Sequence, residues 1–172
     1  MIFFNRVKTV PLSCSLHVYT YNMHIPVKRE KTLPLLPCAC ANLRRAARAV
    51  TRLYNRELLP EGVEITQFAL LMALNQVGEI SQGELGEILA LDSTSLTRML
   101  KLLKEHGWVR AHEGDDRRVR LFRLTKTGRK KFQECLPRWK RAQDQLRAAL
   151  GEKIMGQLGG VLGEVTRVSV EG

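Results

Sequence analysis

Several common classes of protein are excluded by what this sequence does not contain. No stretch approaches the roughly 18 consecutive apolar residues that a membrane-spanning helix needs, so an integral membrane protein is excluded and no membrane partner is expected. Four cysteines in 172 residues are too few for a scaffold held together by disulfide bonds. G-x-G-x-x-G, the P-loop, H-E-x-x-H and G-x-S-x-G are all missing. We therefore expect no enzyme, no catalytic residue, no metal site and no cofactor.

Acidic residues are also scarce. There are 17 Asp and Glu against 28 Lys and Arg, which gives a net charge of +11 and a pI near 10.0. Such an excess points to a polyanionic partner, nucleic acid before a membrane surface. Glu79–Asp92 nevertheless contains four acids and no base, whereas Ser93–Lys126 contains nine bases and four acids. Because exposed surfaces usually mix their charges, this reversal of sign requires a local reason.

Residues 1–36 differ from the rest of the chain. Prolines interrupt them, and no helical or alternating pattern lasts beyond a few residues. We favour a poorly ordered extension, or a start codon assigned too early with Met23 as a later start. The alternative is a basic arm that contacts DNA phosphates through the cations of residues 28–31 (Lys28, Arg29 and Lys31).

Apolar residues recur with helical spacing over the domain that we place at residues 37–172. A first helix is expected over Cys38–Leu58, with an arginine at every fourth position of a solvated face. A second helix is apolar on nearly all sides, which is typical of a helix in the middle of a core. We expect Thr66 to cap it and Gln76 to lie near its end.

The next two helices are short and close together. Ser81-Gln82-Gly83-Glu84 matches a capping box, and we expect the helix after it to bury Leu85, Ile88 and Leu89. A few residues later, Ser93 to about His106 forms a fourth helix with an apolar stripe on one face. Small hydroxyls and cations lie on its other face, so this pair is typical of a helix-turn-helix.

The second helix of a helix-turn-helix enters the major groove of DNA. There, Ser and Thr approach base edges closely and Arg binds guanine. The residues expected to read DNA are Ser93, Thr94, Ser95, Thr97, Arg98 and Lys101. The acidic helix before them would lie back from the phosphates, which accounts for the reversal of sign. A generic amphipathic helix is the alternative interpretation.

Two strands follow, Trp108–His112 and Val119–Leu124, around a charged loop. A hairpin after a recognition helix is a wing, and cations at its tip suit the narrow minor groove, where the negative potential is enhanced. We expect Asp116 to hold a neighbouring arginine in position, because an isolated long side chain loses more rotamer entropy on binding.

Two further helices end the chain. Thr125 is expected to cap a long helix that runs to Leu150 and is kinked at Pro137. The last helix has apolar residues at nearly heptad spacing but five glycines in or beside it, so packing against a partner must hold it in place. Together with the first helix, these two helices indicate a dimer interface. Two-fold symmetry would set two recognition helices about 34 Å apart.

With these helices, the helix-turn-helix and the wing in this order along the chain, the sequence resembles the MarR family of winged helix-turn-helix regulators from the first helix to the last. The resemblance rests most on Asp115-Asp116-Arg117-Arg118 followed by Leu124-Thr125-Lys126-Thr127-Gly128. It implies a homodimer that binds a palindromic operator in double-stranded DNA, usually as a repressor, and that a small-molecule effector or oxidation releases. It also implies that Arg118 is the minor-groove arginine, that Asp116 supports it, and that Arg117 is a weaker candidate for that role.

We therefore predict an α+β fold that is mainly α-helical, with a small β-hairpin wing. The winged helix-turn-helix spans about residues 65–127 (the winged core), and dimerisation helices span about 38–58 and 126–170. The predicted function is a cytoplasmic, dimeric, sequence-specific transcriptional regulator, whose effector lies between the dimerisation helices and the winged core. An architectural protein that coats DNA without choosing sites and an interaction module that has lost DNA binding are the alternatives.

Cys38 and Cys40 form a C-x-C pair at the start of the first helix. This spacing is too short for a structural zinc site, which needs four ligands. A helix N-terminus favours the thiolate, and Arg44 and Arg45 lie one turn on. The pair is therefore a candidate redox sensor, with inert cysteines as the alternative. Cys135 is expected in the core.

Overall fold

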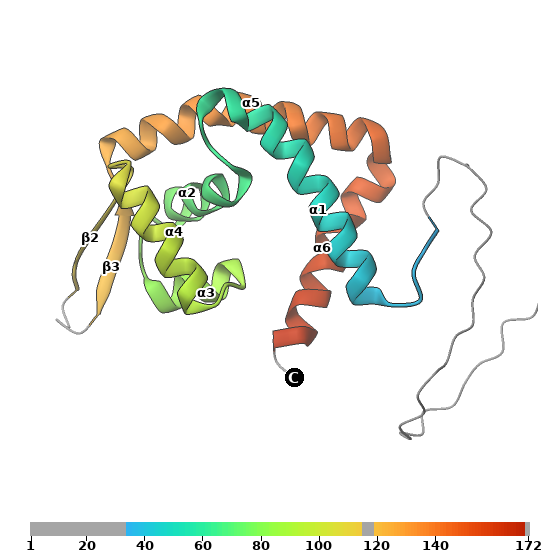
Figure 1. Ribbon diagram of the computed structural model, residues 1–172, viewed down its shortest axis with the longest axis horizontal. Helices are drawn as coiled ribbons and strands as arrows, with labels where there is room; N and C mark the ends of the chain where they lie inside the picture. Colours follow the sequence, from blue (N-terminus) through green and yellow to red (C-terminus); the bar gives the residue numbers. More distant parts are fainter. Residues whose placement is uncertain (1–33, 115–118, 171–172) are drawn as a thin grey trace, which may run out of the picture. The chain divides into compact units, whose positions relative to one another are not determined.

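The computed structural model describes residues 34–114 and 119–170 (Figure 1), and Leu36–Gly172 forms one compact unit. Six α-helices, one 3-10 turn and three strands are present in the described part of the chain. They are α1 (Ala39–Leu58), η1 (Leu59–Glu61), α2 (Ile65–Val77), β1 (Glu79–Ser81), α3 (Gln82–Leu89), α4 (Ser93–Glu105), β2 (Val109–Glu113), β3 (Arg120–Leu124), α5 (Lys126–Leu150) and α6 (Glu152–Val170). The predicted fold class is confirmed. Every helix described here is too short or too polar to cross a bilayer. The predicted N-terminal extension, with its alternative basic arm, lies almost entirely outside the described residues.

The hydrophobic core is centred on α2, because the sequence of this helix is apolar on nearly every side. Phe68, Leu70, Leu71 and Leu74 are buried. Helices α3 and α4, the sheet and the first half of α5 pack around them (Figure 1). Phe68 stacks on Phe132 of α5 with 5.4 Å between ring centroids. Each fully buried Leu or Phe contributes about 1.5–3 kcal/mol relative to exposure, so these side chains are a main source of the stability of this core.

A three-stranded antiparallel sheet with the order β1-β3-β2 closes one side of the core. The sequence predicts only the β2–β3 hairpin, so β1 is an addition. A strand of three residues is too short to show the alternation by which strands are recognised. Its Ile80 lies opposite Phe122 of β3, and both side chains are buried. The central position of β3 explains why it buries Phe122 and Leu124 while the residue between them, Arg123, points to the other face.

Two predicted helix caps are confirmed. The Ser81 hydroxyl accepts the backbone N–H of Glu84, and the Glu84 carboxylate accepts the backbone N–H of Ser81 at 3.1 Å. The Thr125 hydroxyl accepts the backbone N–H of Gly128 at 2.9 Å. These contacts satisfy N–H groups that a helix leaves free at its first turn.

Two other expectations about the helices are wrong. Thr66 lies inside α2, and Glu64 is its cap, in a capping box completed by Gln67. A box that begins with glutamate lacks the Ser or Thr signature by which such boxes are recognised. Ile88 is not buried by α3 but is 55% exposed, whereas Leu85 is fully buried. A helix of eight residues presents only a narrow stripe to the core, and Ile88 lies beside that stripe.

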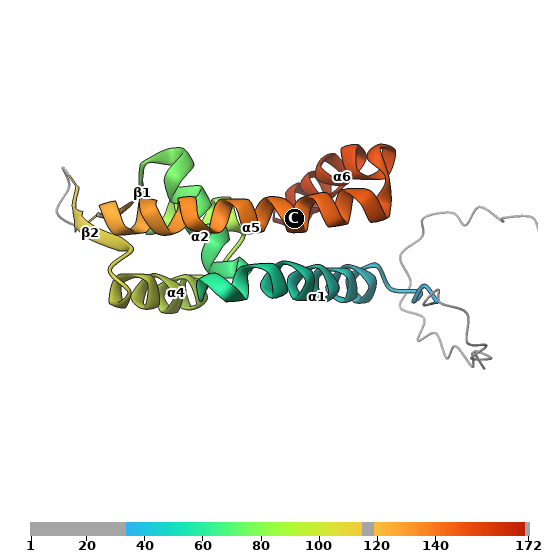
Figure 2. The ribbon, with the colours of Figure 1, turned by 90° about the horizontal axis from the view of Figure 1, so that it is seen from above.

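The remaining helices pack less completely. The C-terminal end of α1 lies against α5, and its Tyr54 and Leu58 are buried. Across this contact, Arg141 Nε of α5 lies 3.8 Å from Glu57 Oε2 of α1. The N-terminal half of α1 and the whole of α6 extend away from the winged core (Figure 1), and Figure 2 separates them on the two sides of α5. None of the side chains described in α6 is buried. We call these two segments the outer helices.

Candidate nucleic-acid interface

The recognition helix α4 is fixed in orientation by its apolar side and by its N-terminal cap. Leu96, Leu100 and Leu103 are buried in the core. At the N-terminus, the Asp92 carboxylate accepts the Ser95 hydroxyl at 2.7 Å and the Ser95 backbone N–H at 2.9 Å. These two hydrogen bonds, the hydroxyl first, hold the pKa of Asp92 below its ordinary value. The opposite face of α4 is therefore presented to solvent in one defined orientation.

The six residues predicted to read DNA divide into two groups. Ser93, Thr94, Arg98 and Lys101 are exposed on the outward face of α4. Lys101 Nζ lies 3.9 Å from the carboxylate of Glu105 in the next turn. The other two hydroxyls already have partners within the protein. Ser95 belongs to the Asp92 cap, and the Thr97 hydroxyl donates to the Ser93 carbonyl at 2.7 Å.

Sequence reasoning does not identify the residue that fixes Thr97 from the other side. The Gln82 side-chain amide, at the start of α3, donates to the Thr97 hydroxyl at 2.7 Å. This hydrogen bond joins the two helices of the helix-turn-helix across their turn. No local pattern predicts it, because the two residues are 15 positions apart. Gln82 therefore belongs to the site as a residue that positions α4.

The wing is described up to its tip. Strands β2 and β3 pair from Val109 opposite Leu124 to Glu113 opposite Arg120, and the Gly114 N–H donates to the Val119 carbonyl at 2.9 Å to close the described end. The predicted wing residues Asp116, Arg117 and Arg118 lie outside the described residues and stay predictions. A groove of about 360 Å³ between α4 and the wing is lined by three basic side chains, with Ala111 and Glu113 completing it. These basic residues are Lys104, His112 and Arg120.

The end of α4, the start of the wing and the start of α5 meet in one tight junction. The Thr125 hydroxyl donates to the Gly107 carbonyl at 2.7 Å. Gly128 approaches Trp108 so closely that a Cβ atom at position 128 would lie 1.9 Å from the Trp108 carbonyl oxygen. The Leu-Thr-x-x-Gly motif thus has a physical reason, since Thr caps α5 and Gly permits the close approach.

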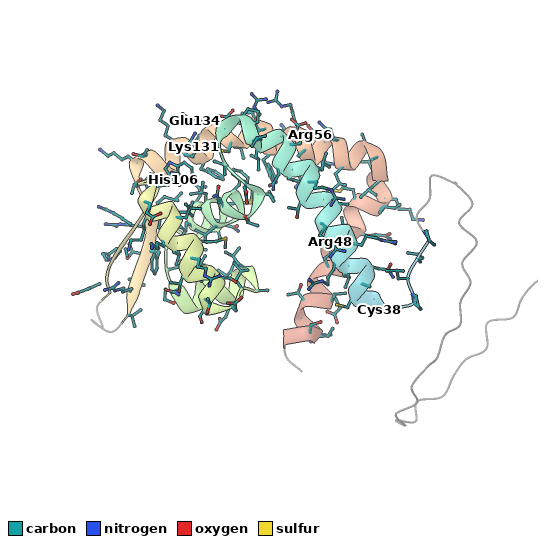
Figure 3. The ribbon with its side chains drawn as sticks, viewed as in Figure 1. Cys38, Arg48, Arg56, His106, Lys131 and Glu134 are labelled. Carbon is teal, nitrogen blue, oxygen red and sulfur yellow. The ribbon has the colours of Figure 1, made fainter. Side chains whose placement is uncertain are left out.

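Aromatic contacts cover the same junction, as Figure 3 shows for His106 and Lys131. The His106 ring stacks on the Trp108 ring at 4.5 Å between centroids, and Lys131 Nζ lies 5.9 Å from the Trp108 centroid. The hydrogen bond with Glu134 raises the pKa of Lys131, so this cation stays charged. These contacts join the end of α4 to the start of α5.

The reversal of sign between the acidic and the basic segment has a structural cause. Of the four acids in Glu79–Asp92, Glu84 completes the capping box of α3 and Asp92 caps α4. The Ser81 hydroxyl and backbone N–H lower the pKa of Glu84, as those of Ser95 do for Asp92. Glu79 contacts two basic residues of the sheet. Only Glu87, which is exposed on α3, has neither role. Three of these four acids therefore stabilise the helix starts and the sheet beside the basic segment Ser93–Lys126.

An apolar cavity of about 560 Å³ lies between α2, α3 and α5. Phe68, Met72, Leu89 and Trp139 are among its lining residues, together with the side chain of Gln143. In the described part of the chain, Gln143 Oε1 is buried and has no hydrogen-bond partner. An apolar cavity with one unsatisfied acceptor has the chemistry of a small-ligand site.

The three cysteines described by the structure fall into two environments. Cys135 is fully buried, and burial raises the pKa of its thiol to about 11, so it is a core residue as predicted. Cys38 and Cys40 are free and exposed at the start of α1. Figure 3 places Cys38 at the far end of α1 from His106. In the described residues, no group of three or more His, Cys, Asp or Glu side chains is placed to hold a metal ion.

Known proteins share this sequence and architecture. Residues 61–118 match the profile of the MarR family. The chain is 31% identical over 106 residues to the uncharacterised HTH-type transcriptional regulator YwoH of Bacillus subtilis, which covers 62% of this chain and 77% of that protein. It is similar to the structure of the M. tuberculosis regulator MosR in complex with DNA, with a TM-score of 0.71 and 30% identity over 78% of this chain and 97% of that one. A mutant of E. coli MarR with operator DNA gives a TM-score of 0.67 and 26% identity over 73% and 91% of the two chains.

Proposed function

Because the chain belongs to the MarR family of transcriptional regulators, which are not enzymes, we propose that it is a sequence-specific repressor that binds a palindromic operator as a homodimer. The observation that carries this proposal is the exposed face of α4, where Ser93, Thr94, Arg98 and Lys101 stand free of the core. Two similar structures have DNA bound, which supports DNA as the partner of this chain.

Each residue of this face has a chemical role in the proposed contact. Arg98 is long enough to bind guanine O6 and N7 in the major groove, and the small hydroxyls of Ser93 and Thr94 approach base edges or phosphates. Lys101 lies one turn further on and supplies charge to the backbone. The wing tip, through Arg118 supported by Asp116, is proposed to enter the adjacent minor groove, with Arg117 as the weaker candidate.

The outer helices are proposed to form the dimer. Ile154, Val161 and Val168 of α6 are 52–60% exposed, and apolar residues exposed to this extent on one helix favour contact with a protein surface. The glycines of α6 lower its intrinsic stability, so a second copy is proposed to hold it in place. The two recognition helices would then lie about one turn of DNA apart, at ~34 Å, on a palindromic site.

The apolar cavity between α2, α3 and α5 is proposed to bind the effector. Its lining favours a molecule with an aromatic or aliphatic body, and Gln143 Oε1 favours one hydrogen-bond donor on that body. The cavity lies behind the helix-turn-helix and against α5. A ligand there would act by changing how α2 and α3 pack on α5, and hence the spacing of the two recognition helices.

Oxidation of Cys38 and Cys40 is proposed as a second signal. Peroxide converts one thiol to sulfenic acid with release of water, and the other thiol then attacks that sulfur and expels water to form the disulfide. Cys38 is the N-cap of α1 and Cys40 lies in its first turn, so the bond would distort the start of an outer helix. The expected readout is a mass loss of about 2 Da after peroxide treatment, abolished in Cys40→Ser. Two unmodified thiols would remove this signal from the proposal.

Competition binding tests the proposed function against the architectural alternative. A specific regulator prefers the region upstream of its own gene over random DNA by roughly a thousandfold or more, whereas an architectural protein shows no such preference. We expect Arg98→Ala to relax base preference and Arg48→Ala, on the exposed face of α1 (Figure 3), to leave it unchanged. Arg118→Ala should weaken binding and alter the preference for narrow minor grooves. Binding without any preference would support the architectural function instead.

A further inference from the structure

Charged side chains from all three strands lie on the outer face of the sheet. Ile80, Phe122 and Leu124 fill the inner face, so the residues that alternate with them point outward. The strand register places Glu79 of β1 opposite Arg123 of β3, and Arg123 opposite Arg110 of β2. This face of the wing therefore holds a single acid of β1 next to the bases of the other two strands.

The Glu79 carboxylate contacts both neighbouring strands. Its Oε2 atom lies 3.2 Å from the Arg123 guanidinium on β3 and 2.8 Å from His112 Nε2 on β2. All three side chains are only about one-third to two-fifths exposed, so solvent screens these contacts less than ordinary surface pairs. One carboxylate thus joins β1, β3 and β2 across the whole width of the sheet.

Both nitrogens of the His112 ring face oxygen atoms. Nδ1 lies 3.0 Å from the backbone carbonyl oxygen of Glu113, so it must carry a proton to make a favourable contact. In the neutral ring, Nε2 would then direct a lone pair at the Glu79 carboxylate. Only the imidazolium form makes both contacts attractive, and the contact with Glu79 is one of charge rather than an aligned hydrogen bond.

Most of the other charged groups around His112 are basic. Arg110 lies two residues earlier on the same strand, and Lys104 of α4 and Arg120 of β3 line the groove beside it. Arg123 shares the Glu79 carboxylate, and the Glu113 side chain is the other acid of this groove. Without Glu79, these cations would repel one another at the base of the wing.

We propose that Glu79 is a positioning residue for DNA binding, whose carboxylate holds the wing hairpin against the helix-turn-helix through Arg123 and His112. Strand β1 lies between α2 and α3 in the chain, so it moves with the helix-turn-helix, whereas β2 and β3 carry the wing. Glu79 therefore connects the two DNA-reading parts. This inference rests on the proposed use of α4 and the wing on DNA.

The direction in which DNA affinity changes on substitution of Glu79 distinguishes a positioning role from a purely electrostatic effect of its charge. Glu79 is an acid on a surface proposed to face a polyanion, so its removal alone should tighten DNA binding. If it positions the wing, the substitution Glu79→Gln should instead weaken binding by about fivefold, which is the size of effect that a partly buried ion-pair network supports. Glu113→Gln is the matched control, because Glu113 is an exposed acid of the same hairpin. It should bind as tightly as the parent or more tightly.

The experiment measures binding of the parent, Glu79→Gln and Glu113→Gln to the upstream duplex at several salt concentrations, with thermal unfolding of each protein. We also expect a smaller salt dependence in Glu79→Gln, because fewer phosphate contacts are kept. Binding of Glu79→Gln that equals or exceeds that of the parent overturns the inference but leaves the proposed function intact. Failure of the parent to bind any duplex overturns the proposed function itself, and the inference with it.

Glu79→Asp keeps the test valid if Glu79→Gln does not fold. The shorter side chain keeps the negative charge but not the reach of the carboxylate to Arg123 and His112. It should therefore weaken DNA binding if Glu79 positions the wing, and leave binding unchanged if only the charge matters. Glu113→Asp is the matched control and should bind as the parent does. Equal binding of Glu79→Asp and the parent overturns the inference.

Discussion

The winged core and the outer helices differ in how completely a single chain buries their apolar side chains. In the winged core, α2 alone buries five residues, and the aromatic ring of Phe68 stacks on that of Phe132. In α6, no described side chain is buried, and Ile154, Val161 and Val168 are more than half exposed. The comparison shows that the fold separates its two tasks. The part proposed to read DNA has its apolar core within one chain, and the part proposed to form the dimer is set apart from it.

The glycines of the two regions differ in the same way. Gly128 lies where another backbone approaches, and a Cβ atom there would overlap the Trp108 carbonyl. At Gly156, Gly159 and Gly160 of α6, an added Cβ atom would meet nothing within 4 Å. The same residue type therefore serves a tight contact in one region and only lowers helix stability in the other.

Disruption of the proposed dimer should have the largest effect on DNA binding. Val161→Asp places a charge on the exposed apolar face of α6, which a second copy cannot bury without cost. We expect a monomer in analytical ultracentrifugation and a loss of DNA affinity of about a hundredfold, because each half-site is then bound alone. The winged core should stay folded in circular dichroism. Thr166→Asp, at an exposed polar position of the same helix, is the control. A Val161→Asp protein that remains dimeric would contradict the proposed interface.

The next effect concerns the junction at Gly128. Gly128→Ala forces the Trp108 backbone away from α5 and should lower the free energy of unfolding by about 3 kcal/mol, as measured by urea denaturation. Gly160→Ala, on α6, should be neutral or raise stability by up to ~1 kcal/mol. Equal effects of the two substitutions would show that the close approach at Gly128 is absent in solution.

A smaller effect is expected at the cap of α5. Thr125→Ala removes the hydroxyl that accepts the Gly128 N–H and donates to the Gly107 carbonyl. It should lower the free energy of unfolding by about 1 kcal/mol. Thr125→Ser keeps a hydroxyl at this position and should therefore keep most of that stability. If both variants unfold at the same urea concentration as the parent, the cap does not contribute to stability.

The smallest effect is a loss of stability in acid. The pKa values of Glu84 and Asp92 are lowered in the folded state by hydrogen bonds from Ser81 and Ser95. A lowered pKa means that the carboxylate stabilises the fold above its ordinary pKa, and that this contribution is lost as the pH falls through the lowered value. Asp92→Asn should therefore show a shallower decrease of melting temperature from pH 5 to pH 3 than the parent.

The sequence predicts much of this architecture because strong local signals mark it. The spacing of Leu96, Leu100 and Leu103 indicates the recognition helix, and the Ser81 and Thr125 caps mark two helix starts. Features that depend on distant contacts are not predictable in this way. Strand β1 exists because β3 pairs with it, and the Thr97 hydroxyl is occupied because Gln82 lies across the turn.

The same limit applies to the functional residues. Helical spacing places Ser95 and Thr97 with the reading residues, but only the three-dimensional contacts show that both hydroxyls have partners in the protein. The pairing of Glu79 with His112 spans two strands and 33 positions of sequence. The roles of Arg117 and Arg118 stay predictions from the resemblance, and the boundary of the N-terminal extension stays a prediction from the sequence pattern.

The turn between α3 and α4 limits which amino acids the helix-turn-helix tolerates there. Ala90 has a φ of +50°, the left-handed region that most L-residues disfavour, and its N–H donates to the Glu87 carbonyl at 3.2 Å. Glycine, asparagine or aspartate can occupy this position with little strain, whereas valine or isoleucine would crowd the backbone. Many substitutions on the outward face of α4 are thus compatible with the fold, whereas only a few residue types are compatible with the bend between α3 and α4.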